Sequence, residues 1–280
     1  MSKRLAIVLM NLGGPDSLDA VRPFLFNLFN DPAIFRLPSP FRTWLARYVS
    51  RKRNPLAMDI YRHLGGGSPL LPNTELQARA LHAALGGGED VRVFIAMRYW
   101  HPFTLQTVAE VKAWKADEAL LLPLYPQFST TTTASSFAAW HKAAKFLRLD
   151  VPTKSVCCYP EEDGFIRAAA GLIAPKLDEA ARHGTPRLLL SAHGLPEKVV
   201  KGGDPYQWQC ERTAKAIVAA LNNPGLDWTL CYQSRVGPMK WIGPATDAEI
   251  RRAGTDKAPL VVAPMAFVSE HSETLVELDI

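Results

Sequence analysis

The end of the chain gathers side chains that could bind a divalent metal or carry protons. In "APMAFVSEHSETLVELDI" an apolar run precedes one imidazole and three carboxylates within eight residues, namely Glu270, His271, Glu273 and Glu277. This mixture of ligands suits a borderline cation such as Fe²⁺. In a regular helix the three glutamates share one face, and a local π-type widening would bring His271 beside Glu273. A solvated acidic helix face is the alternative, which the preceding apolar strand disfavours.

A second histidine stands at the end of another apolar run. His193 in "SAHG" directly follows "RLLL" and precedes Gly194 and Pro196. A histidine at the carboxyl end of a buried strand is well placed to act as a general base or a ligand. A structural role is equally compatible with this residue taken alone.

Aromatic side chains follow several of the same apolar runs. Trp241 lies between two Gly-Pro pairs in "QSRVGPMKWIGP", which indicates a loop where an indole can serve as a stacking wall. Tyr125 in "LPLYPQF" and Arg98 and Tyr99 in "AMRYWHP" have similar positions. Burial in the core is the alternative for each aromatic residue. The glycine-rich "NLGGP" and "GGGSP" match neither dinucleotide nor phosphate-loop patterns, so they favour tight turns.

The elements that could position these residues alternate along the chain. Six short runs are continuously apolar, which is typical of parallel strands buried on both faces, and helix-like segments separate them. The predicted strands are 5–10, 91–97, 118–125, 187–193, 227–232 and 259–267, and the predicted helices include 73–85, 103–116 and 207–221. The alternation predicts βαβ units and a doubly wound α/β fold.

The first and second halves of the chain show a weak repeat. "LAIVLMNLGGP" resembles "LLLSAHGLPE", "IAMRYWHP" resembles "LCYQSRVGP", and "ALLLPLYPQFSTTT" resembles "LVVAPMAFVSEHSET", in the same order. We therefore expect two similar α/β domains, 1–130 and 131–280, although buried strands can resemble one another by chance. Because ligands bind beyond the carboxyl ends of parallel strands, facing domains would place these motifs in one cleft.

Composition excludes several classes of function. The net charge of +5 comes without a basic stripe interleaved with exposed aromatic residues, so we expect no nucleic-acid binding. No apolar run approaches the length of a membrane span, and the N-terminal run is shorter than a secretory signal. Four cysteines, Cys157, Cys158, Cys210 and Cys231, lack paired metal spacing. This pattern predicts reduced thiols in a cytoplasmic protein.

Residues 24–60 do not follow the strand and helix alternation. The segment is rich in aromatic and basic residues and contains four prolines. A buried helix is one interpretation. The other is an exposed apolar lip flanked by cations, which would contact an anionic membrane surface or an apolar ligand that carries carboxylates.

Taken together, these motifs resemble the ferrochelatase family, the terminal enzymes of haem synthesis. The resemblance runs through the whole chain in the motifs "NLGGP", "GGGSPL", "RYWHP", "YPQFSTTT", "SAHGLPEK", "GDPY", "QSRVGPMKWIGP" and "AFVSEHSETLVELD". It implies two similar Rossmann-like (chelatase-type) α/β domains, with parallel four-stranded sheets that face a porphyrin cleft. It also implies insertion of Fe²⁺ into protoporphyrin IX.

The resemblance assigns roles residue by residue. His193 and Glu273 match the active-site histidine and its partner carboxylate, which would also bind the metal. Glu270, His271 and Glu277 form a candidate path for metal or protons, on a helix that the family shows as π-distorted. Residues that match positions around the macrocycle are Met10, Arg62, Arg98, Tyr99, Tyr125 and Trp241. Residues 24–60 match the family's apolar lip, and the cysteines present do not support an iron–sulfur cluster.

One departure from the family pattern leaves the activity of this chain open. Family members continue for several tens of residues beyond "ELD", whereas this sequence ends at Ile280. Three functions are therefore weighed. The first is protoporphyrin ferrochelatase, with a chelatase for coproporphyrin III or another tetrapyrrole as its close variant. The second is a catalytically impaired porphyrin-binding protein. The third is a nucleotide-binding α/β enzyme, which the missing phosphate-loop pattern disfavours.

Overall fold

The computed structural model describes residues 3–235 and 239–276. Glu277 lies outside these ranges, and the side chain of Glu273 is likewise not described. The chain forms two compact units. Unit 1 comprises 1–125, 130–157 and 269–280, and unit 2 comprises 126–129 and 158–268. This grouping differs from the predicted division after residue 130, because the segment 130–157 and the end of the chain belong with the first sheet.

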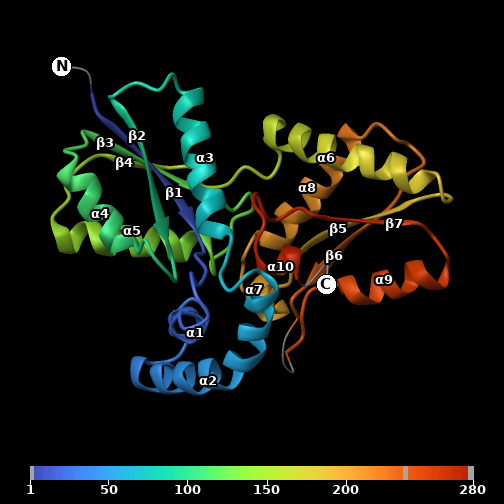
Figure 1. The fold of residues 1–280 in the computed structure, drawn as a ribbon, viewed down its shortest axis with the longest axis horizontal. Coiled ribbons are helices and arrows are strands. Elements are labelled where there is room, and N and C mark those ends of the chain that lie inside the picture. The colour runs from blue at the N-terminus through green and yellow to red at the C-terminus, as the bar shows by residue number, and fades with distance from the viewer. Residues whose placement is uncertain (1–2, 236–238, 277–280) are drawn as a thin grey trace. The chain divides into compact units, whose positions relative to one another are not determined.

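Unit 1 is built on a four-stranded parallel sheet (Figure 1). Its strands are β1 (Leu5–Asn11), β2 (Val91–Met97), β3 (Glu118–Pro123) and β4 (Thr153–Ser155), in the order β2-β1-β3-β4. The central strand β1 is apolar at the buried positions 6–10, because both of its faces are covered, and it ends at the buried Asn11. Val8 faces α4 (Thr104–Ala113) and α5 (Thr133–Leu147), whereas Leu9 faces α3 (Leu70–Ala84).

Unit 2 is built on a three-stranded parallel sheet, where four strands were expected. Over the described residues its strands are β5 (Arg187–His193), β6 (Asp227–Gln233) and β7 (Leu260–Pro264), in the order β6-β5-β7. Leu188 and Leu190 of β5 pack against α6 (Asp163–Ala181) and α8 (Tyr206–Ala220). The helix α9 (Thr246–Thr255) lies along β5 and β6, and the short α7 (Glu197–Lys201) follows β5.

The predicted repeat is confirmed in the topology of the two sheets. The similar runs form β1 and β5, β2 and β6, and β3 and β7, and each set has the same strand order. The two central pairs even share their register, since Leu5 pairs with Val91 through Asn11 with Met97, and Arg187 pairs with Asp227 through His193 with Gln233. Asn11 in unit 1 is thus the counterpart of His193 in unit 2.

The lip-like segment forms two helices of unit 1. α1 (Val21–Phe29) and α2 (Ser39–His63) are joined by residues 30–38, and Pro38 precedes the first turn of α2. Large apolar side chains of α2 remain exposed, with Phe41 at 68% and Trp44 at 69% of their accessible surface. The exposed side chains of α2 agree with the interpretation as an exposed apolar lip, whereas Phe24 and Leu25 of α1 are buried. Contact of this segment with a membrane or a ligand stays a prediction. No helix in the described ranges is long and apolar enough to cross a bilayer.

Candidate active site

In unit 2, the carboxyl end of β5 presents His193. The strand is fully buried up to Ala192, and His193 is the first half-buried residue after it. The next residue must be glycine, because a Cβ on Gly194 would lie 2.9 Å from the carbonyl oxygen of Gln233 and 3.3 Å from Cε3 of Trp241. Backbone hydrogen bonds fix this approach: the Gly194 N–H donates to Gln233 O at 2.8 Å and the Ile242 N–H donates to Leu195 O at 3.0 Å. The fold thus brings Trp241 beside the strand end that carries His193.

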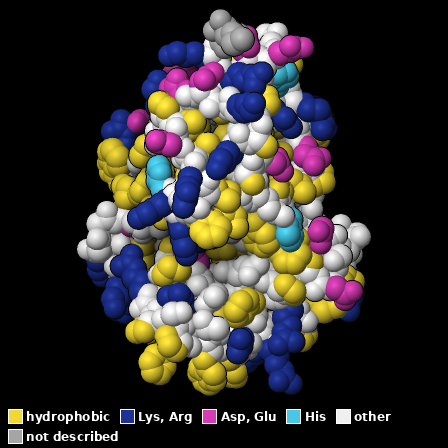
Figure 2. All heavy atoms as spheres, turned by 90° about the vertical axis from the view of Figure 1, so that its left-hand side faces the viewer, with side chains coloured by type: hydrophobic (Ala, Val, Ile, Leu, Met, Phe, Trp, Pro, Cys, Tyr) yellow, Lys and Arg dark blue, Asp and Glu magenta, His cyan; other side chains and the backbone are white. Residues whose placement is uncertain are grey.

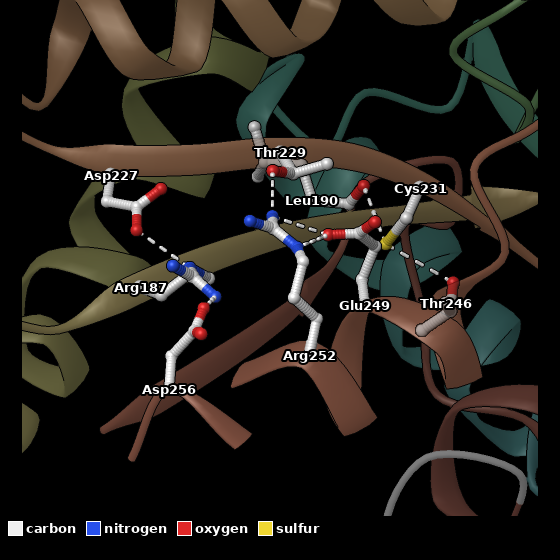
Figure 3. A network of polar contacts seen from close by, with 9 residues as sticks. All are labelled: Arg187, Leu190, Asp227, Thr229, Cys231, Thr246, Glu249, Arg252 and Asp256. Atoms are coloured by element: carbon white, nitrogen blue, oxygen red, sulfur yellow. Dashed lines mark hydrogen bonds and ion pairs between the residues drawn. The ribbon is translucent and has the colours of Figure 1, made fainter. Parts of the chain in front are cut away.

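A buried polar network lies directly behind His193. Ser191, which shares a sheet face with His193, donates its hydroxyl to Oε1 of Gln233 at 2.7 Å. The hydroxyls of Ser191 and Thr246 are 3.0 Å apart. Thr246 also donates to Sγ of Cys231 at 3.3 Å (Figure 3). All of these side chains are buried. Buried polar groups joined in this way hold one geometry, so the network fixes the strand ends beneath His193.

The opposite end of the same sheet is held by ion pairs. Arg187 donates from Nε to Asp227 at 2.7 Å and from Nη1 to Asp256 at 2.7 Å, so one guanidinium joins β5, β6 and the end of α9 (Figure 3). The hydrogen bonds to Asp256 and Asp227 raise the pKa of Arg187. This cluster lies at the amino ends of the strands, away from the edge where ligands bind in such sheets, and therefore supports the fold.

In unit 1, the carboxyl ends of β1, β2 and β3 carry the other predicted porphyrin contacts. Met10 is fully buried in the sheet core, and the Leu124 N–H donates to its carbonyl at 2.8 Å. Arg98 and Tyr99 follow β2, and Tyr125 follows β3. Burial raises the pKa of the Tyr125 phenol, while Ser136 and Arg98 lower it. The guanidinium of Arg98 lies 5.0 Å from the centre of the Tyr99 ring, so the structure brings these two residues together.

A buried carboxylate that the sequence reasoning missed organises this corner. Oδ2 of Asp31 accepts hydrogen bonds from Nη2 of Arg98 at 2.8 Å, from the Tyr99 hydroxyl at 2.7 Å and from the Ser135 hydroxyl. Burial and the Asp31 carboxylate raise the pKa of Tyr99 well above its usual value. One signal could have found Asp31, because it is the only acidic residue between positions 20 and 58.

Arg62 has a different setting from these residues. It lies in the last turn of α2, is exposed, and faces Asp59 at 3.7 Å. The prediction of tight turns at the glycine-rich motifs is confirmed, because Gly13, Gly65 and Gly66 have positive φ. A Cβ on Gly14 would lie 2.3 Å from Oγ of Ser68, and the Ser68 N–H donates to Pro15 O at 2.7 Å. The turns after β1 and before α3 therefore pack against each other.

The acidic end of the chain belongs to unit 1. Asn73 of α3 donates from Nδ2 to the carbonyl oxygen of Glu270 at 3.2 Å. The Thr274 hydroxyl donates to the Glu270 carboxylate, and the His271 N–H donates to Oγ1 of Thr274 at 3.0 Å. These contacts start the helical turn α10 (Ser272–Leu275), which contains Glu273.

The predicted π-type widening is wrong for the described part of this helix. The Leu275 N–H donates to His271 O at 2.9 Å and the Val276 N–H to Ser272 O at 3.0 Å, which is the four-residue spacing of an α-helix. The short turn is set instead by the side chain of Thr274. Within the described ranges no cluster of three or more His, Cys, Asp or Glu side chains is arranged to hold a metal ion.

A family model described as ferrochelatase matches residues 4–280. The chain belongs to the ferrochelatase family. It is similar to a ferrochelatase of Caulobacter vibrioides, with 56% identity over 282 residues that cover 100% of this chain and 80% of that protein. A ferrochelatase of Hyphomonas neptunium is 55% identical and covered to 78%, with 99% of this chain matched. One from Wolbachia sp. subsp. Drosophila simulans is 52% identical and covered to 88%, with 98% of this chain matched.

Family membership gives the reaction class. Ferrochelatases are ferro-lyases that insert iron into a porphyrin in haem biosynthesis, and this chain is an enzyme of that family. Iron and porphyrin are therefore its substrates. Within the ferrochelatase fold seen here, His193 and Trp241 lie in unit 2, whereas Arg98, Tyr125, Glu270 and His271 lie in unit 1. The roles of these residues remain predictions.

Proposed function

We propose that this chain inserts Fe²⁺ into protoporphyrin IX to form protohaem, with His193 and Glu273 as catalytic residues. The observation that carries the proposal is the position of His193. It stands at the carboxyl end of the central strand of unit 2, beside Trp241 and above a buried polar network. That edge is where parallel α/β sheets bind their ligands.

The chemistry requires a base and a way to expose the porphyrin nitrogens. Metallation releases two pyrrole protons, and the nitrogen lone pairs of a flat macrocycle point into its own plane. An enzyme that favours a bent macrocycle lowers the barrier, because the bent form resembles the transition state. In this proposal aromatic residues such as Trp241 hold the macrocycle. His193 accepts the two pyrrole protons in turn and passes each of them to solvent, and the Glu273 carboxylate compensates the charge of the incoming cation.

The acidic residues near the chain end serve as a path in this proposal. Glu270 and His271 precede α10, and Glu270 is already tied to Thr274. Their imidazole and carboxylate groups suit transient binding of Fe²⁺ or of protons. Glu277 continues the same acidic row in the sequence. Iron enters as substrate, and the proposal includes no further cofactor.

The direct test is anaerobic metal insertion into protoporphyrin IX, with Fe²⁺ and with Zn²⁺ as a fluorescent surrogate. We expect His193→Ala and Glu273→Ala each to lower turnover by about 100-fold or more, the usual scale for loss of a general acid or base. His183→Ala and Glu75→Ala are matched controls, because both residues are exposed and lie outside the candidate site. Those controls should keep wild-type rates.

Two results would contradict the proposal in different ways. Equal turnover in His193→Ala and wild type would remove His193 from the chemistry. Tight porphyrin binding without insertion in any form would instead identify a tetrapyrrole-binding protein. Comparison of protoporphyrin IX with coproporphyrin III in the same assay decides between the two porphyrin substrates.

We further propose a cytoplasmic enzyme whose α2 contacts an anionic membrane surface. Phe41, Trp44 and Tyr48 are exposed on this helix, and the rings of Trp44 and Tyr48 stack with centroids 6.1 Å apart. Exposed Arg47 and Arg51 lie among them. Figure 2 displays hydrophobic and basic side chains next to each other at the lower end of unit 1, where α2 lies. Aromatic side chains flanked by cations suit the interface of an anionic bilayer.

Vesicle flotation tests the membrane proposal. Binding to vesicles with anionic lipid should exceed binding to zwitterionic vesicles, and Phe41→Ser with Trp44→Ser should weaken it by roughly tenfold, since two large apolar side chains leave the interface. Phe146→Ser is the control, because Phe146 is equally exposed but lies on α5. Protein that stays unbound on anionic vesicles would refute membrane contact.

A further inference from the structure

Arg98 is held by a carboxylate of its own unit. The guanidinium contacts Oδ2 of Asp31 from Nη2 at 2.8 Å and Oγ of Ser135 from Nε at 2.7 Å. The Asp31 side chain is only 2% exposed, whereas that of Arg98 is 24% exposed. The partly exposed Arg98 guanidinium is therefore paired with the buried Asp31 carboxylate.

The Asp31 carboxylate is anchored independently of Arg98. Its Oδ1 accepts the Ala33 N–H at 2.8 Å, and its Oδ2 also accepts the hydroxyls of Tyr99 and Ser135. Paired buried charges that are also hydrogen-bonded hold each other in place. The Asp31 carboxylate is thus held in one position next to Arg98.

The pair lies where the lip joins the sheet. Asp31 lies in the connection between α1 and α2, and the Ile34 N–H donates to Asp31 O at 3.0 Å. On the α2 side, Arg42 donates from Nε to Asn30 O at 2.9 Å and from Nη1 to Leu37 O at 2.8 Å. Arg98 follows β2 directly. The Asp31–Arg98 pair therefore joins the base of the lip to the carboxyl edge of the unit 1 sheet.

A hollow opens at this place. It has a volume of about 240 Å³ and is lined by residues of α1, of the connection after it and of the segment after β2, among them Asn27, Asp31, Arg98 and Tyr99. Arg98 would be the natural anchor for a carboxylate of an anionic ligand entering here. Asp31 already holds the guanidinium of Arg98. An added carboxylate would therefore meet an ion pair with no net charge, and the Asp31 carboxylate would repel it.

We propose that Asp31 is a specificity-determining residue: by neutralising Arg98 it makes this wall of the site favour a porphyrin edge without carboxylates. The inference rests on the proposed function. It implies that the chain discriminates against coproporphyrin III, which has four propionates, in favour of protoporphyrin IX, which has two. Asp31 acts through Arg98 as a positioning residue and takes no part in metal insertion itself.

The test measures selectivity as a ratio. For Asp31→Asn and wild type, dissociation constants of both porphyrins are determined by fluorescence quenching, and kcat and KM by Zn²⁺ insertion. Asparagine keeps the size of the side chain and an acceptor for the Ala33 N–H. Its Nδ2 then replaces Oδ2, which removes the charge and the acceptor that Arg98, Tyr99 and Ser135 share. We expect the preference for coproporphyrin III over protoporphyrin IX to rise about five- to tenfold, chiefly through KM, as one unpaired cation attracts the additional carboxylates.

Glu110→Gln is the matched control. Glu110 is an exposed carboxylate of the same unit, on α4, and lies outside the candidate site. Its removal changes the net charge equally, so it should leave the ratio unchanged. Equal loss of affinity for both porphyrins in Asp31→Asn would show a purely structural role and overturn the inference. A ratio that rises equally in both variants would point to net charge and overturn it too.

A second variant covers the outcome in which Asp31→Asn does not fold. Asp31→Asn with Arg98→Gln removes both charges of the pair, and the inference expects the wild-type ratio between the porphyrins even where overall turnover falls. A lower relative affinity for coproporphyrin III would show that Arg98 attracts carboxylates in the wild type, which contradicts the inference. The binding arm needs no turnover, so wild-type protein that inserts no metal would refute the proposed function while the ratio still tests Asp31.

Discussion

Gly194 is the residue that allows the His193 strand end and Trp241 to pack closely. A methyl group there would overlap Gln233 O at 2.9 Å and approach Cγ of Arg235 and Cε3 of Trp241 at 3.3 Å each. The backbone oxygen cannot move without breaking the 2.8 Å hydrogen bond from the Gly194 N–H. The sequence motif "SAHG" therefore has a steric requirement at its last position as well as a candidate catalytic group.

Gly194→Ala should lower the free energy of unfolding by about 1–3 kcal/mol, the usual cost of overpacking a tight site. Displacement of Trp241 should also weaken porphyrin binding, measured by fluorescence quenching. Gly171→Ala is the control, because Gly171 lies on exposed α6 with no neighbour within 4 Å of an added Cβ. That change should be neutral or stabilising. Wild-type stability and binding in Gly194→Ala would contradict the steric argument.

The positions of some side chains could be predicted from the sequence, and the partners of others could not. His193 could be placed at a strand end because the apolar run before it is unambiguous. Tyr99 was expected at a ligand wall, and the structure shows its hydroxyl on Asp31 and its ring in a cluster with Val21 and Phe24. Such a partner lies 68 positions away in the sequence. Local patterns carry no information about contacts of that separation.

At the scale of elements, strands were predicted better than helix ends. The runs 91–97 and 187–193 coincide with β2 and β5, because continuous apolar strands have clear limits. β4 was missed, since its three residues, Thr153–Ser155, are mostly exposed and show no apolar pattern. The predicted strand at 259–267 ends earlier, at Pro264, where proline stops the ladder.

The hydrogen bonding of α10 could not be predicted from the spacing of its acidic residues in the sequence. Helical spacing placed three glutamates on one face, and a widened turn was invoked to bring His271 beside Glu273. The described hydrogen bonds show an α-turn that begins with the pairing of Thr274 to Glu270 and His271. Threonine and acidic side chains near the start of a helix commonly form hydrogen bonds with nearby backbone groups. The hydrogen bonds of Thr274 to Glu270 and His271 therefore set the start of this turn.

At the scale of the whole molecule, the four cysteines differ in how deeply the fold buries their side chains. Cys157 is exposed and Cys158 half-buried, whereas Cys210 and Cys231 are buried. Burial raises the pKa of the Cys231 thiol to about 11 and raises that of Cys210 further. The thiolate is the reactive form, so the two buried thiols should be inert near neutral pH.

Reaction with a thiol reagent at pH 8 should therefore label Cys157 fast and Cys158 more slowly, and all four cysteines after unfolding in denaturant. Unfolded Cys231 loses its proton near pH 9 while the folded chain keeps it to about pH 11. Stability from this group is thus complete below pH 9 and is lost as the pH rises through that window. Fast labelling of four thiols in the native protein would contradict the packing.

The sequence by itself determined the fold class, the repeated strand order and the family. Those features rest on apolar periodicity and on short motifs, which depend on neighbouring residues and survive without knowledge of distant contacts. Only the tertiary structure decided that segment 130–157 and the chain end belong with the first sheet, that Phe41 and Trp44 are exposed, and that Asp31 pairs with Arg98. Burial and charge pairing join residues far apart in the chain, so they exist only once it has folded.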